Sequence, residues 1–207
     1  MIAIVDYGVG NLFSLRCSLR SLGAEATVTD DETVLRTADK LLLPGVGAFE
    51  DAAKKLRGSG LQQTLLDEVN KGKPLLGVCL GMQLLFDTSF EYGRHKGLGL
   101  IPGEIRPIAE RVDPALKIPH MGWNTLEITL STPLFKYIKN GDHVYFVHSY
   151  SAVCDPAHVI AETDYGGKLT AAVQRGAVFG CQFHPEKSGR IGLSILRAFC
   201  EYGEEKS

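Results

Sequence analysis

One cysteine of the chain has neighbours that would suit a nucleophile. Cys79 follows the apolar run "PLLGV" and precedes "LGMQLLF", with Gly77 and Gly81 two residues away on either side. These runs predict that Cys79 ends a buried strand and that a helix begins at Leu80. Unpaired N–H groups and the helix dipole favour a thiolate there, as in a nucleophile elbow. The alternative for this stretch alone is a packed cysteine at a strand end.

A histidine and a carboxylate stand close together late in the chain, in "CQFHPEKS". Pro185 favours extended backbone at His184. In extended backbone, Gln182, His184 and Glu186 would lie on one face. A carboxylate beside an imidazole can orient the ring and stabilise its charged form. His184 is therefore the candidate base for Cys79, and Glu186 is the candidate group that orients it.

The stretch "LLLPGVGAF", residues 41–49, is another apolar strand that leads into a glycine-rich turn. Such a turn can direct backbone N–H groups at one point, as a developing oxyanion requires. The alternative is an ordinary turn between a strand and a helix.

The spacing of Cys181 and His184 resembles half of a zinc site. Alternation in a strand would direct these two side chains to opposite faces, and no second pair accompanies them. His143 and His148 have no patterned partner either, and we expect them on the surface or hydrogen-bonded in the core. The sequence therefore predicts no metal site.

Strands and helices alternate over the first part of the chain, whereas the later part is mostly strands. The expected strands are residues 1–5, 25–29, 40–45, 74–79, 98–105, 123–130, 143–150, 158–165, 169–174 and 177–184. The expected helices are 12–22, capped by Asn11, then 48–56, 61–72, 80–89 and 188–200. This order predicts a three-layer α/β fold, with a mostly parallel sheet that gains a late antiparallel portion. We expect a single domain over residues 1–207.

Composition excludes several classes of function. The 207 residues carry a formal net charge of −2, which leaves no basic footprint for nucleic acid. The longest uncharged stretch, Pro74–Phe86, is well short of the roughly 20 residues of a membrane span, and no basic leader follows Met1. Five irregularly spaced cysteines suit free thiols in a reducing compartment. We therefore expect a cytoplasmic protein that binds neither membrane nor nucleic acid.

The motifs "PGVGAF", "GVCLGMQLLF" and "HPEKS", in this order, resemble the signatures of class I (triad) glutamine amidotransferases. The resemblance covers essentially the whole chain and implies a flavodoxin-like α/β fold without a cofactor. It implies a Cys79–His184–Glu186 triad that hydrolyses L-glutamine to glutamate and ammonia through a thioester. It further implies oxyanion N–H groups at Val46 and Leu80, and a glutamine pocket lined by Gly47, Gln83, Ser149 and Tyr150.

Within this family, "DYGVGNL", "MGWN", "YFVHSY" and the lysine of "HPEKS" resemble the glutaminase subunits of imidazole glycerol phosphate synthases. This resemblance implies a heterodimer with a (β/α)₈-barrel synthase subunit, which gates the glutaminase. The barrel would use the ammonia to convert PRFAR to imidazole glycerol phosphate and AICAR in histidine biosynthesis. The implied interface comprises an exposed Tyr7 with Asn11, Met121, Trp123, Asn124 and Lys187.

Three other interpretations remain open at this point. "GVGNLF" begins like a dinucleotide-binding fingerprint, but Phe13 occupies the position of the third glycine. A non-catalytic regulatory or scaffold subunit is a second interpretation, against which the presence of all three triad residue types argues. A third is a glutaminase for anthranilate, GMP or pyridoxal phosphate synthesis.

Overall fold

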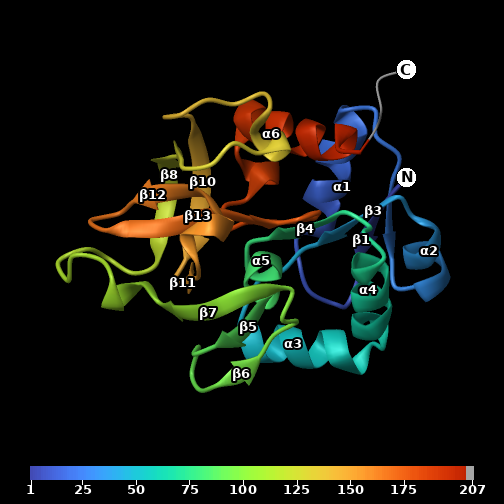
Figure 1. The fold of residues 1–207 in the computed structure, drawn as a ribbon, viewed down its shortest axis with the longest axis horizontal. Coiled ribbons are helices and arrows are strands. Elements are labelled where there is room, and N and C mark those ends of the chain that lie inside the picture. The colour runs from blue at the N-terminus through green and yellow to red at the C-terminus, as the bar shows by residue number, and fades with distance from the viewer. Residues whose placement is uncertain (204–207) are drawn as a thin grey trace.

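The computed structural model describes residues 1–203 and is built around one large sheet (Figure 1). Its eight strands lie in the order β2-β1-β3-β4-β14-β13-β12-β9. The pairs from β2 to β14 are parallel, and those from β14 to β9 are antiparallel. The predicted mostly parallel sheet with a late antiparallel portion is therefore confirmed.

Strands and short helices make up most of the described chain. The strands are β1 (Ile2–Val5), β2 (Ala26–Thr29), β3 (Lys40–Leu43), β4 (Leu75–Val78), β5 (Phe86–Ser89), β6 (His95–Lys96), β7 (Ile101–Pro107), β8 (His120–Thr125), β9 (Glu127–Ile128), β10 (His143–His148), β11 (Tyr150–Val153), β12 (Val159–Asp164), β13 (Lys168–Arg175) and β14 (Val178–Cys181). The α-helices are α1 (Leu12–Ser21), α2 (Glu32–Thr37), α3 (Phe49–Gly58), α4 (Leu61–Asn70), α5 (Leu80–Leu84) and α6 (Gly189–Glu201). The 3₁₀ turns are η1 (Ile108–Glu110), η2 (Pro133–Phe135), η3 (Pro156–His158) and η4 (Pro185–Lys187).

Helices cover both faces of the large sheet, as Figure 1 shows, with α1 and α6 on one side and α3, α4 and α5 on the other. Neighbouring residues of β1 accordingly belong to different cores: Ile4 packs with the α1 and α6 side, and Ala3 with the opposite side. Because such strands are buried on both faces, they read as continuous apolar runs. No helix in residues 1–203 is long and apolar enough to cross a bilayer.

The helix predicted for residues 80–89 is wrong beyond its first turns. Helix α5 ends at Leu84, and Phe86–Ser89 is strand β5 of a smaller sheet with the order β11-β7-β5-β6. The carbonyl of Leu85 accepts hydrogen bonds from the N–H groups of Leu100 and Ile101, at 2.8 and 3.0 Å. These distant partners occupy the carbonyl that a longer helix would need.

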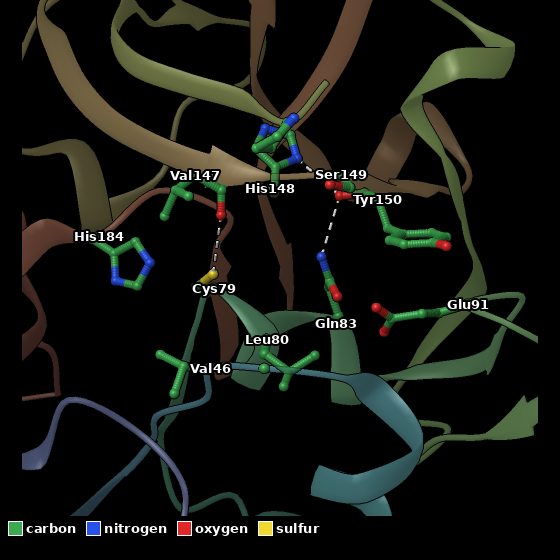
Figure 2. A pocket seen from close by; sticks show the side chains of 12 residues that line it. Val46, Cys79, Leu80, Gln83, Glu91, Val147, His148, Ser149, Tyr150 and His184 are labelled. Atoms are coloured by element: carbon green, nitrogen blue, oxygen red, sulfur yellow. Dashed lines mark hydrogen bonds between the residues drawn. The ribbon is translucent and has the colours of Figure 1, made fainter. Parts of the chain in front are cut away.

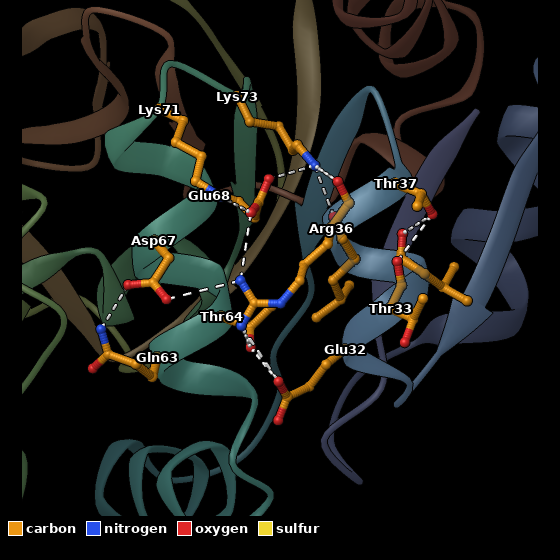
Figure 3. A network of polar contacts seen from close by, with 12 residues as sticks. Glu32, Thr33, Arg36, Thr37, Gln63, Thr64, Asp67, Glu68, Lys71 and Lys73 are labelled. Atoms are coloured by element: carbon orange, nitrogen blue, oxygen red, sulfur yellow. Dashed lines mark hydrogen bonds and ion pairs between the residues drawn. The ribbon is translucent and has the colours of Figure 1, made fainter.

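A buried carboxylate joins the short helix α2 to α4 (Figure 3). The Glu68 side chain is 5% exposed, and its oxygens lie 2.7 Å from Lys71 Nζ, 2.8 Å from Lys73 Nζ and 3.6 Å from Arg36 Nη1. Lys73 also donates to the carbonyls of Leu35 and Arg36, both at 2.8 Å. Hydrogen bonds from Lys71 and Lys73 lower the pKa of Glu68 to about 2. The Glu68 carboxylate therefore forms ion pairs with Arg36 near the end of α2 and with Lys71 and Lys73 near the end of α4.

Glu68→Gln should destabilise the fold by removing the charge that these cations share. We expect a melting temperature lower by about 2–10 °C at pH 7, from the usual worth of hydrogen bonds to charged groups. The folded-state pKa lies below the ordinary value of about 4.3, so the carboxylate stabilises above about pH 4 and loses its effect between pH 4 and 2. Thermal melts from pH 7 to pH 2 should therefore converge for the two proteins.

Glu50→Gln is the matched control, because Glu50 is an exposed carboxylate whose ion pairs, with Lys54 at (i, i+4) and with His95, lie at the surface. Its melting temperature should change little. A difference between wild type and Glu68→Gln that persists unchanged at pH 2 would contradict the assigned role of the carboxylate.

Candidate active site

Cys79 lies where β4 meets α5, at the corner that the sequence predicts. Its backbone has φ 54° and ψ −112°, a conformation that costs a side-chain-bearing residue free energy. The turn is tight: a Cβ on Gly77 would lie 2.7 Å from the carbonyl oxygen of Gly81. The N–H of Cys79 donates to the carbonyl of Cys181 at 2.7 Å, which fixes the corner to the neighbouring strand β14. The geometry is that of a nucleophile elbow.

The predicted imidazole–carboxylate pair is present, although its backbone differs from the prediction. His184 Nδ1 lies 2.8 Å from Glu186 Oε1, and both side chains are almost fully buried. The strand expected over residues 177–184 ends at Cys181, as β14 does, and residues 182–183 form a bend. His184 itself is extended, and Pro185 begins the 3₁₀ turn η4. The prediction that extended backbone continues through Glu186 is thus wrong, and the tight turn brings the carboxylate back onto the ring.

Asn11 has a different partner from the one predicted. It stands at the N-cap of α1, yet its side chain makes no capping hydrogen bond. Instead, Asn11 Nδ2 donates to Glu186 Oε1 at 3.4 Å. The amide therefore supports the carboxylate that orients His184.

Burial acts to lower the pKa of His184, but hydrogen bonds with Cys79 and Glu186 outweigh it and raise the pKa to about 9. The charged ring is thus favoured over the neutral ring at neutral pH. Since the folded value exceeds the ordinary value of about 6.5, this stabilisation is complete below pH 6.5 and is lost as the pH rises through 9. The site can hold an imidazolium beside the sulfur of Cys79.

A pocket of about 340 Å³ opens beside Cys79 (Figure 2). Eight of its lining residues were expected at the site from the sequence: Val46, Gly47, Cys79, Leu80, Gln83, Ser149, Tyr150 and His184. Gln83 is 5% exposed, so it is not an ordinary exposed helix residue. The pocket is large enough for an amino acid and small enough to exclude a dinucleotide.

The glycine-rich turn at residues 44–47 packs against the start of α5. A Cβ on Gly45 would lie 2.5 Å from the backbone nitrogen of Gly81, so the two backbones touch. Tyr7 anchors the same turn, because its hydroxyl donates to the carbonyl of Pro44 at 2.7 Å. The expectation of an exposed Tyr7 is wrong: the side chain is buried, and burial raises its pKa.

Sequence reasoning missed Glu91, which lines the pocket opposite Cys79 (Figure 2). Its Oε2 accepts a hydrogen bond from the N–H of Phe49 at 2.6 Å. Burial raises the pKa of this carboxyl above its ordinary value. The turn "FEYG" gave no periodic signal that linked Glu91 to the other site residues.

The residues expected to meet a partner lie near the triad. Met121 and Trp123 on β8 are 65% and 56% exposed, unusually high for such side chains. The Trp123 ring contacts Tyr145, over which the exposed Lys187 places its ammonium group. Asn124 is half-buried and donates to the carbonyl of Asp164 at 2.8 Å.

The sequence matches the family "Glutamine amidotransferase class-I" over residues 3–201, and the chain belongs to that family. Two solved structures share its fold. One, described as a glutamine amidotransferase, has a TM-score of 0.76 at 22% identity and covers 97% of this chain and 98% of its own. The other, PurLQS from Thermotoga maritima, has a TM-score of 0.74 at 20% identity and covers 97% of both chains.

Relatives of higher identity narrow the resemblance to one kind of subunit. Imidazole glycerol phosphate synthase subunit HisH of Syntrophotalea carbinolica is 48% identical over 203 residues, 96% of this chain and 98% of that protein. The HisH subunit of Listeria monocytogenes is 46% identical over 201 residues, 97% of this chain and 95% of that protein. The resemblance to these subunits, inferred from the motifs, is confirmed.

Glu186→Gln tests the origin of the His184 pKa. Because the carboxylate favours the charged ring, its replacement by a neutral amide should lower the His184 pKa by about one unit or more from its value near 9. A pH titration of the ¹⁵N-labelled imidazole by NMR measures this change. Glu201→Gln, which removes a surface carboxylate, should leave the titration of His184 where it was, whereas an unchanged value in Glu186→Gln would contradict the assignment.

Proposed function

We propose that this chain is the glutaminase subunit of an imidazole glycerol phosphate synthase. The observation that carries the proposal is the arrangement around Cys79. This residue has a strained backbone and lines a pocket of amino-acid size together with His184, whose ring is paired with the buried carboxylate of Glu186. The HisH relatives, aligned over nearly the whole chain, support the choice of pathway.

In the first half of the reaction, the Cys79 thiolate attacks the side-chain amide carbon of glutamine. The tetrahedral intermediate collapses when the C–N bond breaks and the charged His184 gives its proton to the departing nitrogen. Ammonia leaves, and a γ-glutamyl thioester remains on the sulfur. Glu186 holds the ring in place and stabilises its charged form.

In the second half, His184 takes a proton from water, whose oxygen attacks the thioester carbon. The C–S bond breaks, glutamate leaves, and the sulfur retains the electron pair. In both halves the oxyanion is stabilised by the backbone N–H groups of Val46 and Leu80, which belong to the two backbones that touch at Gly45. Losing one such donor typically costs about 10²–10³ in rate.

The far end of the pocket suits the amino-acid part of glutamine. Glu91 is a carboxylate that faces the pocket opposite Cys79, and it would pair with the α-ammonium group. Gly47, Gln83, Ser149 and Tyr150 would hold the remainder of the substrate with polar side-chain and backbone groups.

The ammonia would pass to a (β/α)₈-barrel synthase subunit, which converts PRFAR to imidazole glycerol phosphate and AICAR. The exposed pair Met121 and Trp123, with Lys187 beside them, is an apolar surface with a charged rim, as interfaces require. A heterodimer through this surface would place the partner close to the triad, where it could gate the glutaminase.

Cys79→Ala should abolish glutamine-dependent synthesis in the complex, by at least about 10³-fold, because no nucleophile remains. Synthesis from added ammonia should continue, since the barrel would carry that chemistry. Assays of the complex with glutamine and with an ammonium salt make the comparison. Loss of both activities, with the complex still assembled, would contradict the proposal.

Trp123→Ala should weaken association with the synthase barrel by about 10-fold or more, because buried tryptophans commonly dominate interface energies. Calorimetric titration of the barrel measures the affinity, and circular dichroism checks that the isolated subunit stays folded. Tyr137→Ala, which removes another partly exposed aromatic, is the control and should bind as wild type does. Equal affinity for Trp123→Ala and wild type would remove Trp123 from the interface.

A further inference from the structure

We propose that Gln182 is a catalytic residue that donates a hydrogen bond from its side-chain amide to the Cys79 sulfur and stabilises the thiolate. Gln182 Nε2 lies 3.8 Å from Cys79 Sγ. The inference rests on the proposed function, because it concerns the same nucleophile.

The Gln182 side chain is fully buried, at 0% exposure, and its hydrogen bonds go to site residues. Nε2 faces Cys79 Sγ, and Oε1 accepts from Gln83 Nε2 at 2.9 Å. Burying an amide is unfavourable unless hydrogen bonds replace its lost water. The two hydrogen bonds that offset this cost are made with Cys79, the candidate nucleophile, and with Gln83, which lines the substrate pocket.

The backbone carbonyl of Tyr150 determines the orientation of the Gln182 amide, through Gln83, which lies between them. Gln83 lies 3.2 Å from the backbone oxygen of Tyr150, which can only accept, so Gln83 must turn its NH₂ group toward it. The same NH₂ group then faces Gln182, which must present its oxygen to Gln83. The remaining group of Gln182, the NH₂ donor, is left for the sulfur.

A buried histidine fixes that carbonyl from the other side. His148 Nδ1 lies 2.8 Å from the Tyr150 oxygen, and His148 Nε2 lies 3.0 Å from His120 Nδ1. Burial lowers the pKa of both rings to about 4, so at neutral pH each has one donor and one acceptor nitrogen. His148 donates to Tyr150 and accepts from His120, so the Tyr150 carbonyl accepts from both His148 and Gln83. From Gln83 the donors then point through Gln182 to Cys79.

The donor matters most when the sulfur is charged. In the thiol, Cys79 Sγ can donate to the carbonyl of Val147, at 4.0 Å. In the thiolate, that carbonyl has no proton to accept and its dipole opposes the charge, whereas the amide of Gln182 still donates. Gln182 would therefore favour the attacking thiolate, and would favour it again when the C–S bond of the thioester breaks and the sulfur takes back the electron pair.

Gln182→Met tests the proposal with a side chain of similar length and no donor. We expect kcat for glutamine hydrolysis in the complex to fall about 10-fold, with KM within about twofold. Alkylation of Cys79 by iodoacetamide, followed at its own peptide by mass spectrometry, should reach half its maximal rate about one pH unit higher.

Gln174→Met is the matched control on the adjacent strand β13, where Gln174 bonds to Thr132 and to the carbonyl of Gly176. It should leave kcat and the alkylation profile unchanged. An unchanged alkylation profile in folded Gln182→Met would overturn the proposal. So would a raised KM with unchanged kcat, because that result would mean that Gln182 acts only through Gln83.

A measurement on the unsubstituted side chain keeps the test independent of how Gln182→Met folds. With ¹⁵N-labelled glutamine residues, one buried side-chain amide should shift over the pH range in which Cys79 becomes reactive to iodoacetamide. The shift should vanish in Cys79→Ala, and the absence of any such resonance in wild type would overturn the proposal. Failure of the proposed function would look different, since wild-type Cys79 would then not be required for glutamine hydrolysis at all.

Discussion

The close contact between two turns at the end of the sheet determines where everything else in the site can lie. A Cβ on Gly81 would fall 1.9 Å from the carbonyl oxygen of Leu43, and one on Gly45 would fall 2.5 Å from the nitrogen of Gly81. Backbone therefore packs directly on backbone between the end of β3 and the start of α5. Any side chain at these positions would push the glycine-rich turn away from Cys79 and separate the expected oxyanion donors from the nucleophile.

The order of the strands brings the chemistry to this contact. Strands β3, β4 and β14 are adjacent and parallel, so their carboxyl ends meet at one edge of the sheet. The glycine-rich turn follows β3, Cys79 follows β4, and His184 lies just beyond β14. Three segments that are far apart in the sequence thus become neighbours through the pairing of these strands.

The sequence alone predicted most of the alternation of strands and helices, although it missed the helix α2 and the strand β5. It also predicted the elbow at Cys79 and the pairing of His184 with Glu186. These features depend on local patterns: apolar runs, glycines at a turn and two residues of close spacing. Tyr7 and Asn11 were placed less well, because each has a partner distant in the chain, Pro44 and Glu186 respectively. A local pattern cannot report a hydrogen bond that only the tertiary fold creates.

Glu91 and Gln182 are two residues whose place in the site a local sequence pattern also could not predict. Glu91 reads as an ordinary turn carboxylate, and only the curvature of the chain after β5 brings it to the pocket. Gln182 was expected on one strand face with His184, but β14 ends at Cys181, and alternation along a strand does not say which amide atom meets the sulfur. That assignment needs the Tyr150 carbonyl and the bonds that converge on it.

The carboxylate of the triad also connects the buried chemistry to the surface. Glu186 Oε1 is shared between His184, at 2.8 Å, and Asn11, at 3.4 Å, and Lys187 is the next residue along the chain. Asn11 precedes α1, and Lys187 lies exposed over the Tyr145 ring beside Trp123. Contact with a partner at these positions would move the neighbours of Glu186 without entering the pocket. Because Glu186 helps to set the charge of His184, a small displacement there would change the base directly, and this gives a physical route by which a partner could gate the reaction.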